Sequence, residues 1–168
     1  ILYVDDSILA APTKTELREA IEAVQSTKLE ITLEGELSDF LGVNIQREKG
    51  GRISFTQKHV IDSILDDLRL ADNKASVRDV PAPSSKILTR DKDGKPHDDS
   101  FDYRSVIGKM NYLEKATRPD IAYAVHQCAR FSAEPKETHA KAVRWLGRYL
   151  LGTRSMGTYF MPRLEKGL

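Results

Sequence analysis

The sequence predicts an α+β protein in which a small sheet with one helix is followed by a linker and then by a group of helices. Three observations indicate this class. Strand-like runs and one helical pattern share the first 56 residues, and apolar residues recur with helical spacing from Gln57 onward. The stretch 72–100 contains three prolines and little periodicity. With 168 residues and 40% apolar content, the chain is long enough to bury a core, in one moderate domain or two small ones.

The chain opens with a pattern typical of a tight hairpin followed by a helix. Apolar residues 1–4 and 8–11 flank the turn-forming pair Asp5-Asp6. Thr13 and Glu16 then have the spacing of a capping box, which predicts a helix over 14–27. Its expected apolar stripe is Leu17, Ala20, Ile21 and Val24.

Three further strands are expected before residue 57. The alternation of Leu29, Ile31 and Leu33 with polar residues predicts a half-buried strand. The runs 40–47 and 52–56 predict a hairpin, because glycines lie between them. We therefore expect residues 1–56 to form one sheet-containing part.

Helices dominate the remainder of the predicted structure. A first helix is expected within 57–71 and a linker over 72–100. Three helices should follow in 101–168, with a possible strand at 158–161. Their expected apolar positions are Val106, Ile107, Met110 and Leu113, then Ile121, Ala122, Val125, Cys128 and Ala129, then Ala140, Val143, Leu146, Tyr149 and Leu150.

Charge is unevenly distributed along the chain. Residues 101–168 carry 12 Lys and Arg against 6 Asp and Glu, net +6, and residues 1–100 carry 14 against 19, net −5. This favours the C-terminal part as the face that binds a polyanion, and a solvated helix surface without a ligand is the alternative. Within it, Lys141, Arg144 and Arg148 are spaced to form a basic ridge on the last helix, suited to a phosphate backbone.

The composition also bears on location. The apolar runs are too short to span a bilayer, so we expect no membrane partner. A single cysteine, Cys128, is expected to be a core residue and fits a reducing, intracellular compartment. The first residue is not Met and lies within an apolar run, so we expect the natural chain to begin elsewhere.

The pair Asp5-Asp6 is the best candidate for catalysis. Two-metal phosphoryl transfer needs carboxylates held rigidly near two Mg²⁺ ions, and a turn between apolar strands meets that need. Ordinary turn chemistry explains the same pair without any metal.

Other motifs extend the pattern. Tyr3-Val4-Asp5-Asp6 is followed by Phe40-Leu41-Gly42 on a predicted strand. Further motifs follow in order: Tyr103-Arg104-Ser105-Val106-Ile107-Gly108, Tyr112-Leu113, Thr117-Arg118-Pro119-Asp120-Ile121, Arg130-Phe131 and Arg148-Tyr149-Leu150-Leu151-Gly152-Thr153. In this order the chain resembles the reverse transcriptase region of copia-type LTR retrotransposon Pol polyproteins, over nearly its whole length.

The resemblance implies a fold and an activity. It implies the C-terminal part of a polymerase palm with a primer-grip-like hairpin at 1–56, a first thumb helix at 57–71, and a helical thumb and connection segment leading toward RNase H at 101–168. The implied activity is RNA-directed DNA polymerase, a nucleotidyltransferase, with RNA/DNA template-primer and deoxynucleoside triphosphates as partners. In the cell this implies a cytoplasmic virus-like particle or the nucleus, beside the rest of Pol: fingers, RNase H and integrase.

The resemblance also implies roles for particular residues. Asp5 would be the principal ligand of two Mg²⁺ ions and Asp6 a supporting one, while Tyr3 and Val4 would line the cleft. Phe40, Leu41 and Gly42 would hold the primer strand. The family's remaining catalytic Asp lies on an earlier palm strand beyond this sequence, so we expect the fragment alone to be inactive. A non-catalytic nucleic-acid-binding remnant of a retroelement, and a helical interaction module, are the alternatives.

Thr117-Arg118-Pro119-Asp120 also has a structural interpretation. Thr117 is expected to cap the next helix, Pro119 to occupy its first turn, and Asp120 to favour its positive end. Arg118 remains free to pair with an acidic residue or with nucleic acid.

Overall fold

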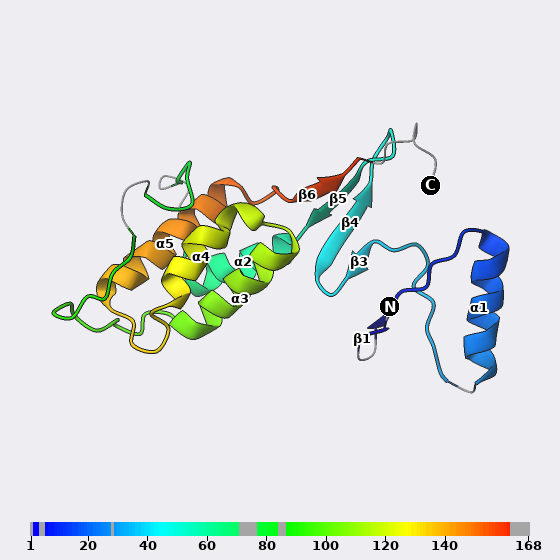
Figure 1. The fold of residues 1–168 in the computed structure, drawn as a ribbon, viewed down its shortest axis with the longest axis horizontal. Coiled ribbons are helices and arrows are strands. Elements are labelled where there is room, and N and C mark those ends of the chain that lie inside the picture. Colours follow the sequence, from blue (N-terminus) through cyan, green and yellow to red (C-terminus); the bar gives the residue numbers. More distant parts are fainter. Residues whose placement is uncertain (1, 4–5, 28, 71–76, 84–86, 162–168) are drawn as a thin grey trace. The chain divides into compact units, whose positions relative to one another are not determined.

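A computed structural model describes residues 2–3, 6–27, 29–70, 77–83 and 87–161, with backbone only at 2, 3 and 6. The chain is α+β, as predicted. It divides into two compact units, 1–41 and 42–168, and each is described by itself. Figure 1 shows the elements of each unit. The expected domain boundaries after residues 56, 71 and 100 stay predictions.

The first unit begins with the predicted hairpin. Strands β1 (Leu2–Tyr3) and β2 (Asp6–Ser7) are antiparallel, with Leu2 opposite Ser7 and Tyr3 opposite Asp6. Helix α1 (Lys14–Ser26) follows, and its capping box is confirmed. The Glu16 N–H donates to Thr13 Oγ1 and the Thr13 N–H donates to Glu16 Oε2, each over 3.2 Å. This reciprocal pair satisfies two amides that a helix start otherwise leaves without partners.

The strand predicted through Leu29, Ile31 and Leu33 is wrong. Residues 29–38 contain no helix or strand, and Leu29 and Leu33 are 64% and 56% exposed. An alternating pattern needs a neighbouring strand to pair with before it forms a strand, and residues 29–38 pair with none in the described chain. The unit ends with β3 (Asp39–Phe40).

The expected continuous strand 40–47 is interrupted. Leu41 and Gly42 both have positive φ, 52° and 71°, as the central residues of a type I′ turn do. Strand β4 (Val43–Arg47) begins after this turn and pairs antiparallel with β5 (Ile53–Thr56). The predicted glycine turn joins them, with Gly50 and Gly51 in the left-handed region.

The last predicted strand is confirmed. Strand β6 (Thr158–Phe160) pairs antiparallel with β5, placing Phe160 opposite Ile53 and Tyr159 opposite Ser54. It therefore returns the end of the chain to the strands that precede the helices.

The predicted helices of the second unit are present and enclose its core (Figure 1). They are α2 (Lys58–Asp67), α3 (Tyr103–Ala116), the 3₁₀ turn η2 (Pro119–Ile121), α4 (Ala122–Ala129) and α5 (Glu137–Gly152). Among the described residues, every fully buried apolar side chain belongs to one cluster between Ile61 and Leu150. Each such Val, Leu, Ile or Met contributes about 1.5–3 kcal/mol on burial, so this cluster dominates the stability of the unit.

The predicted linker lies against α5. In its described parts, 77–83 and 87–100, it has no helix or regular strand. The His97 N–H donates to the Pro135 carbonyl and the Glu137 N–H donates to the Lys95 carbonyl, each over 3.0 Å. These bonds fix the linker to the start of α5. None of the helices in the described chain is long and apolar enough to cross a membrane.

Candidate functional site

The hairpin that carries the candidate carboxylates is confirmed in its backbone. Strands β1 and β2 pair antiparallel, with Tyr3 opposite Asp6. Val4 and Asp5 lie outside the described residues, and the side chains of Tyr3 and Asp6 do too. The expected roles of these four residues in metal and substrate binding therefore stay predictions.

The donor chemistry of the hairpin suits a hard cation. Carboxylate oxygens are the ligands that Mg²⁺ prefers, and adjacent carboxylates at a hairpin end are compatible with one metal centre. Over the described residues, no group of three or more His, Cys, Asp or Glu side chains is placed to hold a metal ion. The binding of Mg²⁺ by Asp5 and Asp6 stays a prediction.

The motif Phe40-Leu41-Gly42 forms the end of β3 and the turn after it. Phe40 and Leu41 are half-buried and Gly42 is exposed. A Cβ at Gly42 would meet no atom within 4 Å, so the positive φ, and not space, favours glycine there. The motif shapes a tight turn, and its contact with a primer strand stays a prediction.

The predicted basic ridge contains residues in three different environments. Lys141 is exposed, with Nζ 3.7 Å from Glu137 Oε2. Arg144 is half-buried and donates to the Leu68 carbonyl over 3.0 Å and to Ser100 Oγ over 2.8 Å. Arg148 is also half-buried, and its Nε is enclosed without a partner. The guanidinium of Arg144 thus anchors the ends of two loops to α5.

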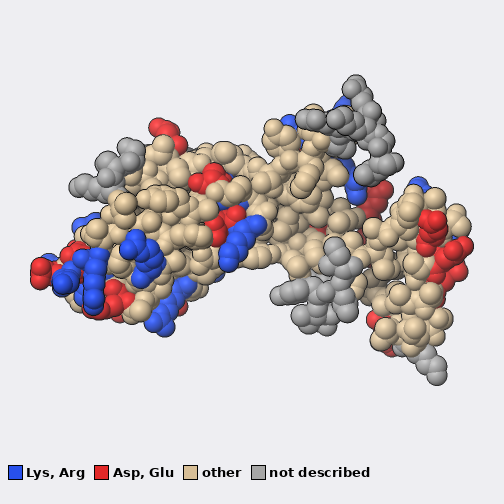
Figure 2. All heavy atoms as spheres, viewed as in Figure 1, with Lys and Arg blue, Asp and Glu red and all other residues tan. Residues whose placement is uncertain are grey.

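On the face drawn in Figure 2, the charge distribution of the described residues also shows no continuous basic ridge. Figure 2 shows Lys and Arg over the helical part of the second unit in separate groups with Asp and Glu between them. Binding of a phosphate backbone by Lys141, Arg144 and Arg148 stays a prediction, and two of the Arg144 donors already have acceptors within the protein.

Sequence reasoning did not foresee the extent of a buried polar network around Arg118. The Arg118 side chain is 1% exposed, and its Nε and Nη2 donate to the two carboxylate oxygens of Asp120 over 2.9 and 2.8 Å. Its Nη1 and Nη2 also donate to the carbonyl and hydroxyl oxygens of Thr153 over 2.9 and 2.7 Å. The Tyr149 hydroxyl donates to Asp120 Oδ2 over 2.8 Å. The network therefore ties η2 to the end of α5.

The motif that contains Arg118 is structural, as one interpretation of it predicted, but Thr117 does not cap the start of the next helix; it is the C-cap of α3, where its N–H donates to the Leu113 carbonyl. The Thr117 hydroxyl donates to Gln57 Oε1 over 2.9 Å, and the residue preceding η2 is Arg118, which makes no side-chain cap. Thr117 and Gln57 are both buried, so their hydrogen bond links the start of α2 to the end of α3. Spacing alone did not reveal this partner, which lies 60 positions away.

The network shifts two pKa values. Burial would raise the pKa of the Asp120 carboxyl, but hydrogen bonds from Arg118 and Tyr149 outweigh it and lower that pKa below its ordinary value. Burial, with the hydrogen bond to Asp120, raises the pKa of Tyr149. Asp120 is therefore ionised and Tyr149 protonated near neutral pH.

Cys128 is a core residue, as predicted. Its side chain is 2% exposed, and burial raises the pKa of its thiol to about 12. The thiol is therefore protonated near neutral pH and has little nucleophilic character.

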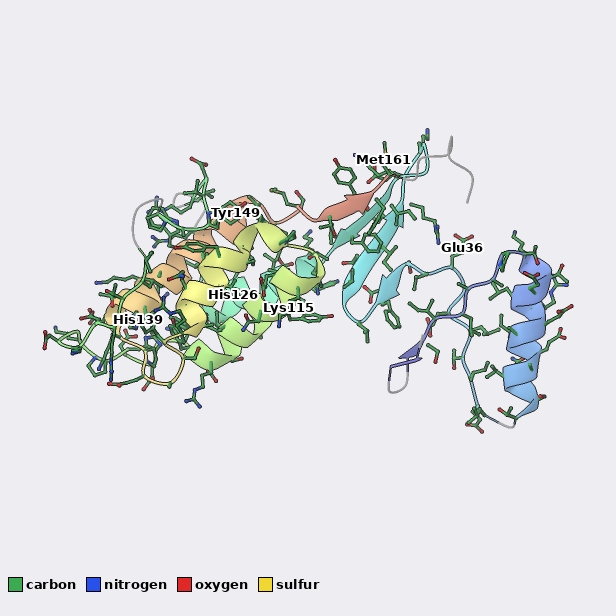
Figure 3. All side chains as sticks on the ribbon, viewed as in Figure 1. Glu36, Lys115, His126, His139, Tyr149 and Met161 are labelled. Carbon is green, nitrogen blue, oxygen red and sulfur yellow. The ribbon has the colours of Figure 1, made fainter. Side chains whose placement is uncertain are left out.

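Two histidines have specific partners that the sequence did not indicate. His139 is buried, and its Nδ1 accepts from the Lys136 N–H over 3.0 Å while Nε2 lies 3.1 Å from the Thr89 carbonyl. His126 is exposed on α4 with Nε2 3.0 Å from the buried Glu114 carboxylate. Figure 3 labels His139 in the first part of α5, Tyr149 in the later part, and His126 on α4. These contacts are distributed over the second unit and form no common cluster.

The chain is similar to transposon proteins of plants. It is 28% identical over 167 residues to the "Retrovirus-related Pol polyprotein from transposon RE1" of Arabidopsis thaliana, covering 99% of the chain and 11% of the polyprotein. It is 30% identical over 161 residues to the corresponding polyprotein from transposon TNT 1-94 of Nicotiana tabacum, covering 91% and 12%. Several of its homologues are copia-type retrotransposon Pol polyproteins. The homology supports a fragment of a retroelement protein, as the sequence motifs predicted.

The matches cover only part of the length of each relative. The chain spans about a tenth of these two polyproteins. An uncharacterised mitochondrial protein of Arabidopsis thaliana, 30% identical over 159 residues, is shorter, and the match covers 95% of the chain and 63% of that protein. No protein-family model and no solved structure matches the chain.

Proposed function

We propose that the chain is the C-terminal part of the reverse transcriptase domain of a copia-type retrotransposon Pol polyprotein. The observation that carries the proposal is the antiparallel pairing of β1 with β2, with Tyr3 opposite Asp6, in a chain homologous to Pol polyproteins. The strands and helices that follow would belong to the palm, the thumb and the connection toward RNase H.

In the complete parent protein, residues of this chain would bind metal, primer and template. Two Mg²⁺ ions supply the electrostatic stabilisation for nucleotidyl transfer when bound. Asp5 and Asp6 would hold them, Tyr3 and Val4 would border the nucleotide, and the turn at Leu41-Gly42 would lie along the primer strand. Deoxynucleoside triphosphates and an RNA/DNA template-primer would be the substrates, in an intracellular setting with the rest of Pol.

Residues 1–168 by themselves should not polymerise. A pair of carboxylates on one hairpin is an incomplete ligand set for two metal ions, and the proposal places the remaining Asp and the fingers on preceding sequence. Purified chain should therefore incorporate no more nucleotide on a template-primer than its Asp5→Asn variant.

A chimera tests the proposal directly. The segment of the RE1 polyprotein that matches this chain is replaced by residues 1–168, and template-dependent nucleotide incorporation is measured on soluble chimera. We expect incorporation in the chimera, a loss of at least about 100-fold with Asp5→Asn or Asp6→Asn, and no such loss with the exposed control Asp99→Asn. The proposal fails if a soluble chimera that binds template-primer shows equal incorporation with and without Asp5→Asn.

A second candidate is a non-catalytic nucleic-acid-binding remnant of a retroelement, and the match to a protein much shorter than the Pol polyproteins is consistent with a remnant. The coding sequence upstream of Ile1 separates the two candidates. An open frame with fingers and the further palm Asp supports the polymerase, and stop codons or a start codon immediately before Ile1 support the remnant.

A further inference from the structure

Two arginine side chains, Arg78 next to α5 and Arg148 within it, each contain a buried hydrogen-bond donor. Their Nε atoms are enclosed and make no hydrogen bond to any residue that the structure describes. Among described residues, only Gln57 and His97 share this property. Buried donors are nearly always paired, so two unpaired guanidinium donors in one region require a physical explanation.

Backbone and side-chain contacts bring these two arginines together. The Arg78 N–H donates to the Arg148 carbonyl over 3.4 Å, and Trp145 Nε1 donates to the Val80 carbonyl over 3.0 Å. At Gly152, an added Cβ would overlap Val77. Since Trp145, Arg148 and Gly152 are three and then four residues apart, segment 77–80 lies along one face of α5.

The positive charge in this region is not compensated within the described chain. The guanidinium of Arg78 stacks on the Trp145 ring, with Cζ 4.2 Å from the ring centroid. Neither Arg78 nor Arg148 forms an ion pair with any described residue, and both are half-buried. Their neighbour Arg144 differs, because its guanidinium has two protein acceptors. Partly desolvated charges of like sign attract an anion more strongly than exposed ones do.

We propose that Arg78 and Arg148 form a binding site for one phosphate group, with the Trp145 ring supporting the Arg78 guanidinium. A guanidinium edge matches phosphate oxygens in two parallel, charge-assisted hydrogen bonds. Phosphate binding through Nε requires each side chain to rotate, because both Nε atoms are enclosed in this structure. The same chemistry suits inorganic phosphate and the phosphate of a nucleic-acid strand, and only the second source rests on the proposed function.

The single tryptophan of the chain reports on this site. Inorganic phosphate is titrated into the full chain at constant ionic strength, with sodium chloride as the matched salt, while Trp145 emission is recorded. We expect a saturable change in emission, with affinity reduced at least about tenfold by Arg148→Gln or Arg78→Gln. Arg130→Gln, which removes the exposed arginine that follows α4, should leave the affinity within about twofold. Asp79→Asn should raise the affinity for phosphate, because the substitution removes a negative charge next to Arg78 in the sequence.

A second arm distinguishes the two sources of phosphate. Anisotropy of a fluorescein-labelled single-stranded DNA oligonucleotide is measured with the same variants. If Arg148→Gln weakens oligonucleotide binding and phosphate competes with the oligonucleotide, the site is assigned to nucleic acid. If the unsubstituted chain and Arg148→Gln bind the oligonucleotide equally, the site is assigned to free phosphate. Absence of any phosphate-dependent emission change, or equal loss with Arg148→Gln and Arg130→Gln, overturns the proposal. Urea unfolding of each variant confirms that it is folded, and the polymerase chimera tests the proposed function separately.

Discussion

Arg118 shows how one side chain fixes the geometry of several elements. Its guanidinium is almost fully buried, yet its hydrogen bonds reach a carboxylate, a carbonyl and a hydroxyl. A buried charge is tolerated only when partners compensate its lost hydration. Because these partners come from η2 and from the end of α5, the pair Arg118–Asp120 specifies how those two elements meet.

The Asp120 carboxyl makes stability depend on acid pH. Since its pKa is lower in the folded chain than the ordinary 3.8, it contributes stability that is fully present above that value. The contribution is lost as pH falls from about 3.8 through the folded pKa. At pH 7, Asp120→Asn should lower the free energy of unfolding by about 1–3 kcal/mol relative to the unsubstituted chain. Below pH 4 the difference between the two proteins should be smaller. Urea unfolding between pH 2 and 7 measures both effects. Equal pH dependence in the two proteins would contradict this assignment.

At the level of elements, contacts between helices decide which glycines are required. Gly147 of α5 is buried against α2 and the residues after it, and an added Cβ would lie 2.6 Å from Leu68 Cδ1 and 2.9 Å from Leu70 Cδ1. Gly108 of α3 is exposed, and an added Cβ would meet no atom within 4 Å. Both residues are inside helices, so they form a matched pair.

Substitution of these two glycines should have opposite effects. Gly147→Ala is expected to destabilise the chain by about 1–3 kcal/mol, because the core side chains of Leu68 and Leu70 must move. Gly108→Ala should stabilise it by about 0.5–1 kcal/mol, because alanine loses less conformational entropy in a helix. Chemical denaturation measures both. A stabilising Gly147→Ala would show that α5 does not approach α2 as described.

At the scale of the whole molecule, the two units differ in how they are stabilised. In the first unit, no side chain described in 7–41 is fully buried, and α1 depends on its capping box and a half-buried stripe. The second unit encloses the buried cluster from Ile61 to Leu150. Short helices without a buried face are marginal in water.

Hydrogen exchange should separate the units. Amides of α1 are expected to exchange faster than those of α3 and α5 by a factor on the order of 100 or more, since they open without exposing a core. Mass spectrometry of peptides from each helix measures the rates. Comparable protection in α1 and α5 would indicate that α1 is stabilised by a contact beyond those described.

The sequence predicted much of the fold because the relevant signals are local. Apolar spacing located α1 to α5, the capping box located the start of α1, and turn residues located the hairpins. Two strand predictions were wrong, for different reasons. Leu29, Ile31 and Leu33 lack a pairing strand, and Leu41-Gly42 interrupts the run 40–47 with left-handed backbone geometry.

The sequence by itself determined the α+β class, the helical periodicity and the ordered motifs shared with retrotransposon Pol polyproteins. Only the tertiary structure decided which charged residues have partners within the protein. Arg118 and Asp120 are two positions apart, but the Tyr149 donor comes from α5 and the Thr153 acceptors from the residue that caps its end. Arg144 and Arg148 lie four residues apart on α5, so the sequence pattern treats them alike. They differ in their hydrogen bonds, because Leu68 and Ser100 supply acceptors to Arg144 alone. Hydrogen-bond partners distant in sequence are brought together by packing of the core, and no local pattern encodes them.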